Sequence, residues 1–296
     1  GGTDLDLFKV TLKSGERVLF DCRARRMDSR MAPVMDLLDA SGRKLATVRR
    51  NVRQDAVLDY TATADGEYVL RLYDSVYGGG ADHFYRLTIT SGPVLDFVLP
   101  ASVLPGQTVE VNLYGRGLPG GQPSPFKSAG GKPLEMLKVP VTAPADGGLF
   151  AASEPAGPAE GNVSGFAYSL ASPSGSSNAV TVYLAQAATA VEVEPNEAAA
   201  QAQKLTVPVE VTGNFATKGD ADTYAFDAQA GQVLWIDVHG QRNGGQTDPY
   251  FAVQQVTVNE KGEEKVAQMT LVDDNPTNLA GNIFNTQSDD PAFRFV

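Results

Sequence analysis

The sequence is poor in the residues that carry disulfide, thiolate-metal and histidine chemistry. It contains one cysteine, Cys22, and two histidines, His83 and His239, among 296 residues. A single cysteine excludes an internal disulfide framework and a four-cysteine zinc site. No G-x-S-x-G, H-E-x-x-H or G-x-x-x-x-G-K-[ST] motif occurs. We therefore expect this chain not to be an enzyme.

Long apolar runs and a basic excess are also lacking. No stretch approaches the roughly 18 apolar residues of a membrane span. The formal net charge is -11, and residues 187–296 carry most of it, with 6 Lys and Arg against 16 Asp and Glu. Because nucleic-acid affinity depends largely on a basic surface, this distribution argues against nucleic acid as a partner. It favours divalent cations or solubility alone.

Two parts of the chain repeat each other. Asp4 aligns with Asp220, an offset of 216 residues, and the match continues without a gap to Pro33 and Pro249. Solenoid repeats have periods of about 20–50 residues, so this offset indicates a repeat of domain size.

The periodicity within each copy is that of β-strands. In RVLFDCRAR, Val18, Phe20 and Cys22 share one face, while Leu19 and Asp21 share the other. The expected strands include residues 17–25, 33–39, 67–74, 83–89, 108–114, 165–172 and 178–185. Glycine-rich turns such as ADGEY separate them, and no convincing helix appears. This pattern predicts an all-β chain built of sandwiches.

We expect three tandem β-sandwich domains, at residues 1–91, 92–186 and 187–296. The middle one reads as an Ig-like sandwich, and the last begins with the linker QAATAVEVEPNEAAAQAQ. Pairing residues 54–58 with residues 290–294 leaves the second copy without counterparts of DGEYVLRLYD and FYRLTI. Since a sandwich that loses its last strands has an open core, we expect the parent chain to continue beyond Val296.

The motifs of the two copies resemble a known family. EVEPNE, followed by VTGNFATKGDADTYAFDAQAGQVLWIDV, resembles the bacterial pre-peptidase C-terminal (PPC) domain, whose pattern is E-x-E-P-N, a strand, then G-D-x-D-x-[FY]-x-[FY] and a glycine. The first copy resembles the rest of that pattern in LDASGRKLA, ADGEYVLRLYD and FYRLTI. The middle segment resembles the Ig/TIG-like modules of large planctomycete-type secreted or cell-surface proteins. The resemblance implies jelly-roll-like PPC sandwiches, complete in the first copy and partial in the last, in an extracellular protein.

A calcium site in the second copy is the strongest candidate. In collagenase-type relatives, the E-x-E-P-N linker and the G-D-x-D turn together hold calcium. Carried over, the ligands would be Glu192, Glu194, Asn196, Glu197, Asp220 and Asp222. Mixed carboxylate and amide oxygens are the ligands that calcium prefers. At Glu197 the sequence departs from the relatives, which usually carry Asp.

Two other interpretations of these acids stay open. The acids are a solvated linker in the first, with Asp220 and Asp222 capping a turn through the nearby backbone. The second makes PNEAAAQAQ a short helix with Pro195 near its first turn. The first copy has Asp4 and Asp6 without an E-x-E-P-N segment, so we expect no well-formed site there.

The remaining candidates have structural interpretations that we favour. Arg26 and Arg242 share a repeat position, which suggests an ion pair with an acid of the same domain rather than a ligand contact. Trp235 and Tyr250 would suit sugar stacking, but Trp235 aligns with Leu19, which favours packing. A basic run is expected to be a solvated hairpin rather than a polyanion site. It comprises Arg43, Lys44, Arg49, Arg50 and Arg53.

The sequence thus predicts a non-catalytic structural or interaction module of a large extracellular or cell-surface bacterial protein. Its roles would be spacing, adhesion or assembly, with calcium stiffening the linker. Its partners would be other domains of the parent chain, further copies of itself, or a surface glycan or protein. The alternative is a carbohydrate- or protein-binding accessory region of a secreted hydrolase whose catalytic domain lies outside this chain.

Overall fold

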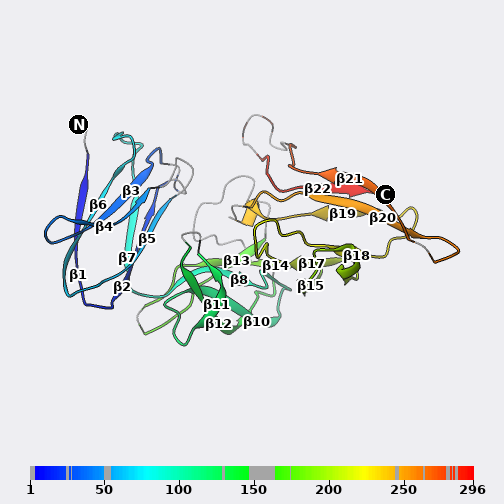
Figure 1. The fold of residues 1–296 in the computed structure, drawn as a ribbon, viewed down its shortest axis with the longest axis horizontal. Coiled ribbons are helices and arrows are strands. Elements are labelled where there is room, and N and C mark those ends of the chain that lie inside the picture. Colours follow the sequence, from blue (N-terminus) through cyan, green and yellow to red (C-terminus); the bar gives the residue numbers. More distant parts are fainter. Residues whose placement is uncertain are drawn as a thin grey trace.

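The protein is almost entirely β in its computed structural model, which confirms the predicted fold class. The structure describes residues 4–24, 27, 29–49, 55–128, 131–146, 164–173, 175–243, 247–262, 264–277, 281, 283 and 286–296. Within these ranges no helix is long and apolar enough to cross a membrane. The strands form three groups along the chain, which we call the first (β1–β7), middle (β8–β14) and third (β15–β22) modules (Figure 1).

The first module is a sandwich of two antiparallel sheets, ordered β1-β6-β3-β4 and β5-β2-β7. Its strands are β1 (Asp6–Leu12), β2 (Arg17–Arg23), β3 (Pro33–Asp39), β4 (Lys44–Arg49), β5 (Ala56–Thr61), β6 (Gly66–Asp74) and β7 (Arg86–Thr90). The expected strands at 17–25, 33–39, 67–74 and 83–89 are therefore confirmed in type and place, with shifted ends.

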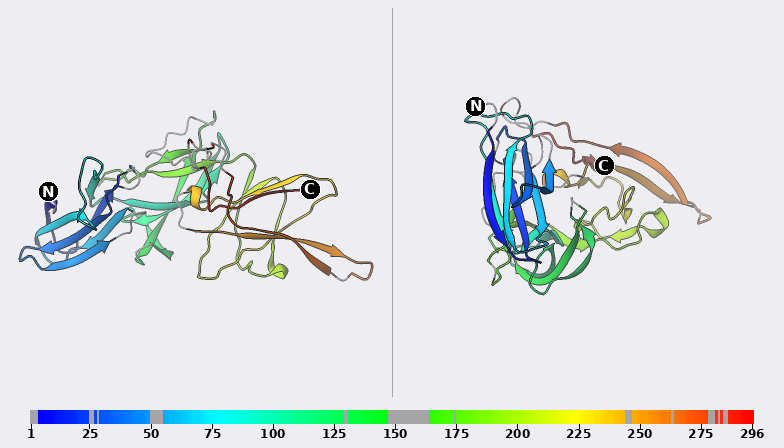
Figure 2. Two further views of the ribbon diagram at one scale, coloured as in Figure 1. Left: turned by 90° about the horizontal axis from the view of Figure 1, so that it is seen from above. Right: turned by 60° about the vertical axis from the view of Figure 1, so that its left-hand side comes forward.

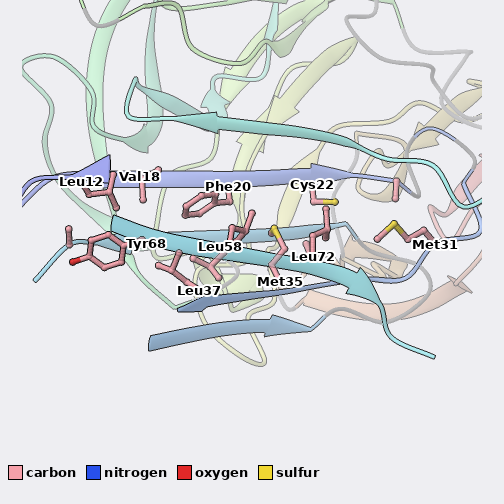
Figure 3. Close-up of a cluster of buried hydrophobic side chains, with 14 residues drawn as sticks. Leu12, Val18, Phe20, Cys22, Met31, Met35, Leu37, Leu58, Tyr68 and Leu72 are labelled. Carbon is pink, nitrogen blue, oxygen red and sulfur yellow. The ribbon is translucent and has the colours of Figure 1, made fainter. Parts of the chain in front are cut away.

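The core of the first module follows from the alternation of its strands. Figure 3 shows the inward side chains of β2, among them Phe20 and Cys22, meeting Met35 and Leu37 of β3. Phe20, Cys22, Met35 and Leu37 are fully buried, and burial raises the pKa of the Cys22 thiol to about 12. Cys22 is therefore a neutral packing residue, as its place in the alternation predicts.

A fully buried acid, Asp36, lies on the opposite side of β3. Its carboxylate accepts hydrogen bonds from Thr47 (2.6 Å) and Arg71 (2.5 Å) and pairs with Lys44 at 3.0 Å. Burial favours the neutral acid, but these three donors outweigh it and lower the pKa of Asp36 to about 2. Part of the basic run is thus tied to acids of its own hairpin, since Arg43 also pairs with Asp39. Arg50 and Arg53 lie outside the described residues.

The middle module packs a four-stranded sheet, β11-β12-β10-β8, against a three-stranded sheet, β13-β14-β9. Its strands are β8 (Val94–Leu99), β9 (Ser102–Val103), β10 (Thr108–Arg116), β11 (Gln122–Lys127), β12 (Pro133–Thr142), β13 (Gly165–Tyr168) and β14 (Val180–Leu184). β9 joins β14 in parallel, and the remaining pairs are antiparallel. Val111, Leu113 and Val182 are fully buried between the two sheets.

Asp59 links the first module to the middle module. Asp59 of β5 accepts hydrogen bonds from Arg17 of β2 (2.9 Å) and from Arg116 of β10 (3.1 Å). Arg116 also binds Asp96 of β8, and Lys132 donates to the Asp59 carbonyl at 2.6 Å. Burial opposes charge on Asp59, yet the surrounding cations lower the pKa of its carboxyl. We call this group the Asp59 junction.

Over its described residues, the third module consists of four two-stranded sheets: β15-β17, β16-β18, β19-β22 and β20-β21. Its elements are β15 (Ala188–Val191), η3 (Ala199–Gln201), β16 (Gln203–Leu205), β17 (Val209–Thr212), β18 (Tyr224–Phe226), β19 (Leu234–Asp237), η4 (Gln241–Asn243), β20 (Phe251–Val258), β21 (Glu264–Val272) and β22 (Ala292–Phe295). The first two pairs are parallel, the others antiparallel. The β20–β21 hairpin projects from the rest of the module (Figure 2).

Matching hydrogen bonds in the two copies correct one part of the repeat alignment. In the first module the Asp55 carboxylate accepts the Ala24 amide at 2.8 Å, and in the third the Asp290 carboxylate accepts the Gly240 amide at 2.8 Å. Ala24 and Gly240 differ by the offset of 216, so Asp290 is the counterpart of Asp55. The sequence alignment paired Asp290 with the neighbouring residue 54. The register of β19 with β22 agrees with the corrected pairing, because Ile236 lies opposite Phe293 as Phe20 lies opposite Leu58.

Candidate metal centre

Three carboxylates of the third module converge where two pairs of parallel strands meet. Glu192 directly follows β15, and its backbone amide donates to the Thr212 carbonyl at 2.9 Å, which extends the β15–β17 ladder. Asp222 lies two residues before β18. One carboxylate oxygen from each of Glu192, Glu194 and Asp222 lies within 4.8 Å of the other two. We call these three the carboxylate cluster.

Asn196 adds a buried amide to this cluster. Its side chain is fully buried and its Nδ2 donates to Glu192 Oε1 at 3.1 Å, while its backbone amide donates to Glu194 Oε2 at 3.1 Å. Its backbone carbonyl accepts the Thr223 amide at 2.9 Å, which ties the segment to β18. The side-chain oxygen Oδ1 has no hydrogen-bond partner. A buried acceptor without a partner costs about 1–3 kcal/mol, so this oxygen calls for a cation or another donor.

Glu192 is held in place by groups around the cluster. Tyr224 donates its hydroxyl to Glu192 Oε1 at 3.2 Å, and the Asn214 amide donates to Oε2 at 2.8 Å. Asp222 Oδ1 is buried and, like Asn196 Oδ1, has no hydrogen-bond partner. The arrangement thus presents two unpartnered oxygens beside two further carboxylates.

The electrostatics show that the cluster is short of positive charge. Desolvation, a hydrogen bond with Glu192 and the negative charges of Glu192, Asp220 and Glu194 raise the pKa of Asp222 to about 7. The pKa of Glu194 is also raised, first by desolvation and then by neighbouring acids. A divalent cation would remove this repulsion, because it favours the charged form of every carboxylate around it.

Two of the six predicted ligands, Glu197 and Asp220, are not part of the carboxylate cluster. Glu197 is exposed and its carboxylate is not part of the cluster. Asp220 caps its own turn, accepting the Ala216 amide at 2.6 Å, as the turn interpretation predicts for this residue. The short-helix interpretation of PNEAAAQAQ is wrong beyond one turn, since η3 covers only Ala199–Gln201 and starts after Pro195.

Three contributors to the centre are absent from the sequence-based set. Tyr224 belongs to the G-D-x-D-x-Y motif and reads as an ordinary strand residue. The Asn214 amide and Gly213 carry no sequence signal, because their role is geometric. A Cβ on Gly213 would lie 2.9 Å from Glu192 Oε2 and 3.1 Å from the Tyr224 hydroxyl, closer than side chains normally approach.

The equivalent place in the first module is organised differently. Asp6, the counterpart of Asp222, accepts a short hydrogen bond from the Tyr85 hydroxyl of the segment before β7. Asp4, the counterpart of Asp220, is exposed. A second acidic group in the third module is formed by Asp248, Asp273 and Asp274, and all three residues are exposed.

Other predicted contacts have mixed outcomes. Arg242 is buried and pairs with Asp290 (3.0 Å) and Asp237 (2.5 Å), which confirms the structural ion pair. Its repeat mate Arg26 lies outside the described residues. The predicted packing role of Trp235 is wrong: its side chain is 64% exposed on β19, and Tyr250 is 68% exposed.

No protein-family model matches the chain, and no curated protein matches it.

Proposed function

We propose that the chain is a non-catalytic structural and interaction region of a large extracellular or cell-surface bacterial protein, with a calcium site in its third module. The observation that carries the proposal is the pair of buried, unpartnered oxygens, Asn196 Oδ1 and Asp222 Oδ1, beside the carboxylates of Glu192 and Glu194. The resemblance of the EVEPNE and GDADTY segments to the PPC pattern supports both the ligand set and the extracellular location.

Calcium fits this donor set better than softer metals do. The four side chains offer only oxygen, and within the described residues no histidine or cysteine joins the cluster. Transition metals select nitrogen and sulfur ligands, whereas calcium prefers carboxylate and carbonyl oxygens. Extracellular calcium modules bind with dissociation constants of roughly 10⁻⁴–10⁻³ M, which suits a site that is filled outside the cell.

Bound calcium would stiffen the linker. Glu192, Glu194 and Asn196 lie in the linker segment between β15 and β16, while Asp222 lies two residues before β18. An ion held by both would fix this segment against β18 at the start of the third module, and the proposed role is spacing or assembly along the parent protein.

Terbium luminescence tests the site directly. Terbium substitutes for calcium, and Tyr224, whose hydroxyl lies 3.2 Å from Glu192 Oε1, would transfer excitation energy to it. We expect sensitised emission that millimolar calcium displaces and that Tyr224→Phe reduces strongly. Emission that persists unchanged in Glu192→Gln would contradict the site.

A second candidate function rests on the two exposed aromatic side chains. Trp235 and Tyr250 are available for stacking on a sugar ring, which favours a carbohydrate-binding accessory region of a secreted hydrolase. Binding on a glycan array at micromolar strength that is lost in Trp235→Ala would support this alternative over a purely structural role.

A further inference from the structure

The third module has an incomplete core compared with its repeat partner. In the first module, Phe20, Met35 and Leu37 are fully buried. Their counterparts Ile236 and Phe251 are only half-buried, and Val253 is at the edge of burial. In the described part of the chain, both clusters of fully buried apolar side chains belong to the first and middle modules.

The difference follows from one strand. In the first module β6 lies between β1 and β3, antiparallel to both, and its Tyr68, Leu70 and Leu72 are 4%, 0% and 1% exposed. By the repeat, β18 corresponds to β1 and β20 to β3. Over the described residues of the third module, β18 pairs with β16 and β20 with β21, and no strand joins β18 to β20.

The direction of the backbone groups shows that β16 does not fill this place. The Ser75 amide donates to the Ala32 carbonyl, so even-numbered residues of β3 point their backbone groups at β6. The residues of β6 that do not bond to β3 bond to β1, and the register pairs these residues with even-numbered residues of β1 such as Phe8. The backbone groups of these β1 residues therefore also point at β6.

In the third module the Gln203 amide donates to the Thr223 carbonyl, so odd-numbered residues of β18 point at β16. The backbone groups of Tyr224 and Phe226 therefore point the other way, toward the position that β6 occupies in the first module. We call the place between β18 and β20 the vacant strand position.

We propose that the vacant strand position binds an added β-strand whose chemistry is that of β6: an extended segment of about nine residues, apolar at every second position and antiparallel to β18 and β20. Backbone hydrogen bonds to the free edges provide the attachment, as in other strand-addition complexes. The alternate apolar side chains complete the half-buried core around Ile236, Phe251 and Phe293. This proposal does not rest on the calcium site, although β18 contributes to both through Tyr224.

The repeat supplies the segment for the experiment. Because Asp290 corresponds to Asp55, Val296 corresponds to Thr61, and a second copy of residues 62–74 appended directly after Val296 reproduces the natural connection to β6. The matched control carries serine at the positions of Tyr68, Leu70 and Leu72 in the appended copy. Hydrogen exchange measured by mass spectrometry reports on β18 and β20, and the β10–β12 pair is the internal reference.

We expect amide exchange at Tyr224, Phe226 and the facing edge of β20 to slow at least tenfold with the apolar segment and to remain unchanged with the serine control. Equal protection by the two segments would overturn the proposal, as would full protection of these amides in the unextended monomer. The unextended chain is also examined by size-exclusion chromatography with light scattering. A dimer with protected β20 edges would show that a second copy fills the position instead, and would equally refute the added-strand proposal.

Discussion

Replacing Asp222 by asparagine should have opposite effects on the stability of the calcium-free and calcium-bound carboxylate cluster, because it removes one charge while keeping the shape of the side chain. Without calcium, the variant loses a repulsion between carboxylates that lie within 4.8 Å of each other. At that distance the repulsion between Asp222 and Glu192 is about 1 kcal/mol with the dielectric constant of water and about 3.5 kcal/mol with an effective value of 20. In chelator at pH 8, where Asp222 is mostly ionised, Asp222→Asn should therefore stabilise the third module.

With calcium the sign reverses. A ligand that binds only the folded state stabilises it by RT ln(1 + [L]/Kd), which for 10 mM calcium and a dissociation constant of 10⁻⁴–10⁻³ M is about 1.4–2.7 kcal/mol. For a module of this size that corresponds to a rise in melting temperature of roughly 6–11 °C. Asp222→Asn should lose most of this increment.

Differential scanning calorimetry with and without 10 mM calcium measures both effects in the full chain. Asp227→Asn is the matched control, since Asp227 is exposed and lies outside the cluster. The control should keep the wild-type response to calcium. A wild-type calcium response in Asp222→Asn, or a variant that is less stable than wild type in chelator, would refute the electrostatic reasoning.

Three further predictions address other parts of the chain. Gly213→Val should weaken calcium binding at least tenfold in isothermal titration, because the added side chain displaces a carboxylate of the cluster; an unchanged affinity would show that the local backbone adapts. The folded-state pKa of Asp36 lies below its unfolded value, so its ionised form contributes about 2 kcal/mol to the free energy of unfolding above pH 4, and this is lost as the pH falls toward 2. Between these pH values the free energy of unfolding of Asp36→Asn should therefore fall by about 2 kcal/mol less than that of the wild type. Arg242→Met leaves the fully buried Asp290 without its cation and should cost about 3–5 kcal/mol in denaturant unfolding, whereas Arg43→Met, in an exposed pair, should cost far less.

Much of the fold could be predicted because its signals are local. The alternation of Val18, Phe20 and Cys22 places β2 and its buried face, and glycine turns place the ends of β3 and β6. The correspondence of Asp55 with Asp290 in the repeat could not be predicted in the same way, because the second copy holds extra residues between β20 and β22. Only the matching hydrogen bonds to Ala24 and Gly240 fix the alignment there.

The candidate site was predicted in outline and not in detail. The resemblance to the PPC pattern brings Glu192, Glu194, Asn196 and Asp222 together as ligands, but it cannot show that Asp220 binds the backbone of its own turn or that Glu197 is exposed. Those outcomes depend on how the linker folds back on β18. The exposure of Trp235 was missed for a similar reason: its counterpart Leu19 is buried, and the aligned position does not carry its surroundings with it.

The Asp59 junction has a consequence for how the first two modules behave as a mechanical unit. Asp59 joins Arg17 on one side of the boundary to Arg116 and Lys132 on the other, and the side chains of Asp59 and Arg116 are largely out of solvent. Buried charges are screened by salt much less than exposed ones, so high ionic strength should leave the angle between the two modules unchanged. The lowered pKa of Asp59 means that the carboxylate keeps its charge until the medium is strongly acidic. We therefore expect the angle between the two modules to change in strong acid and to stay the same in high salt. X-ray scattering of the chain under both conditions would measure this difference.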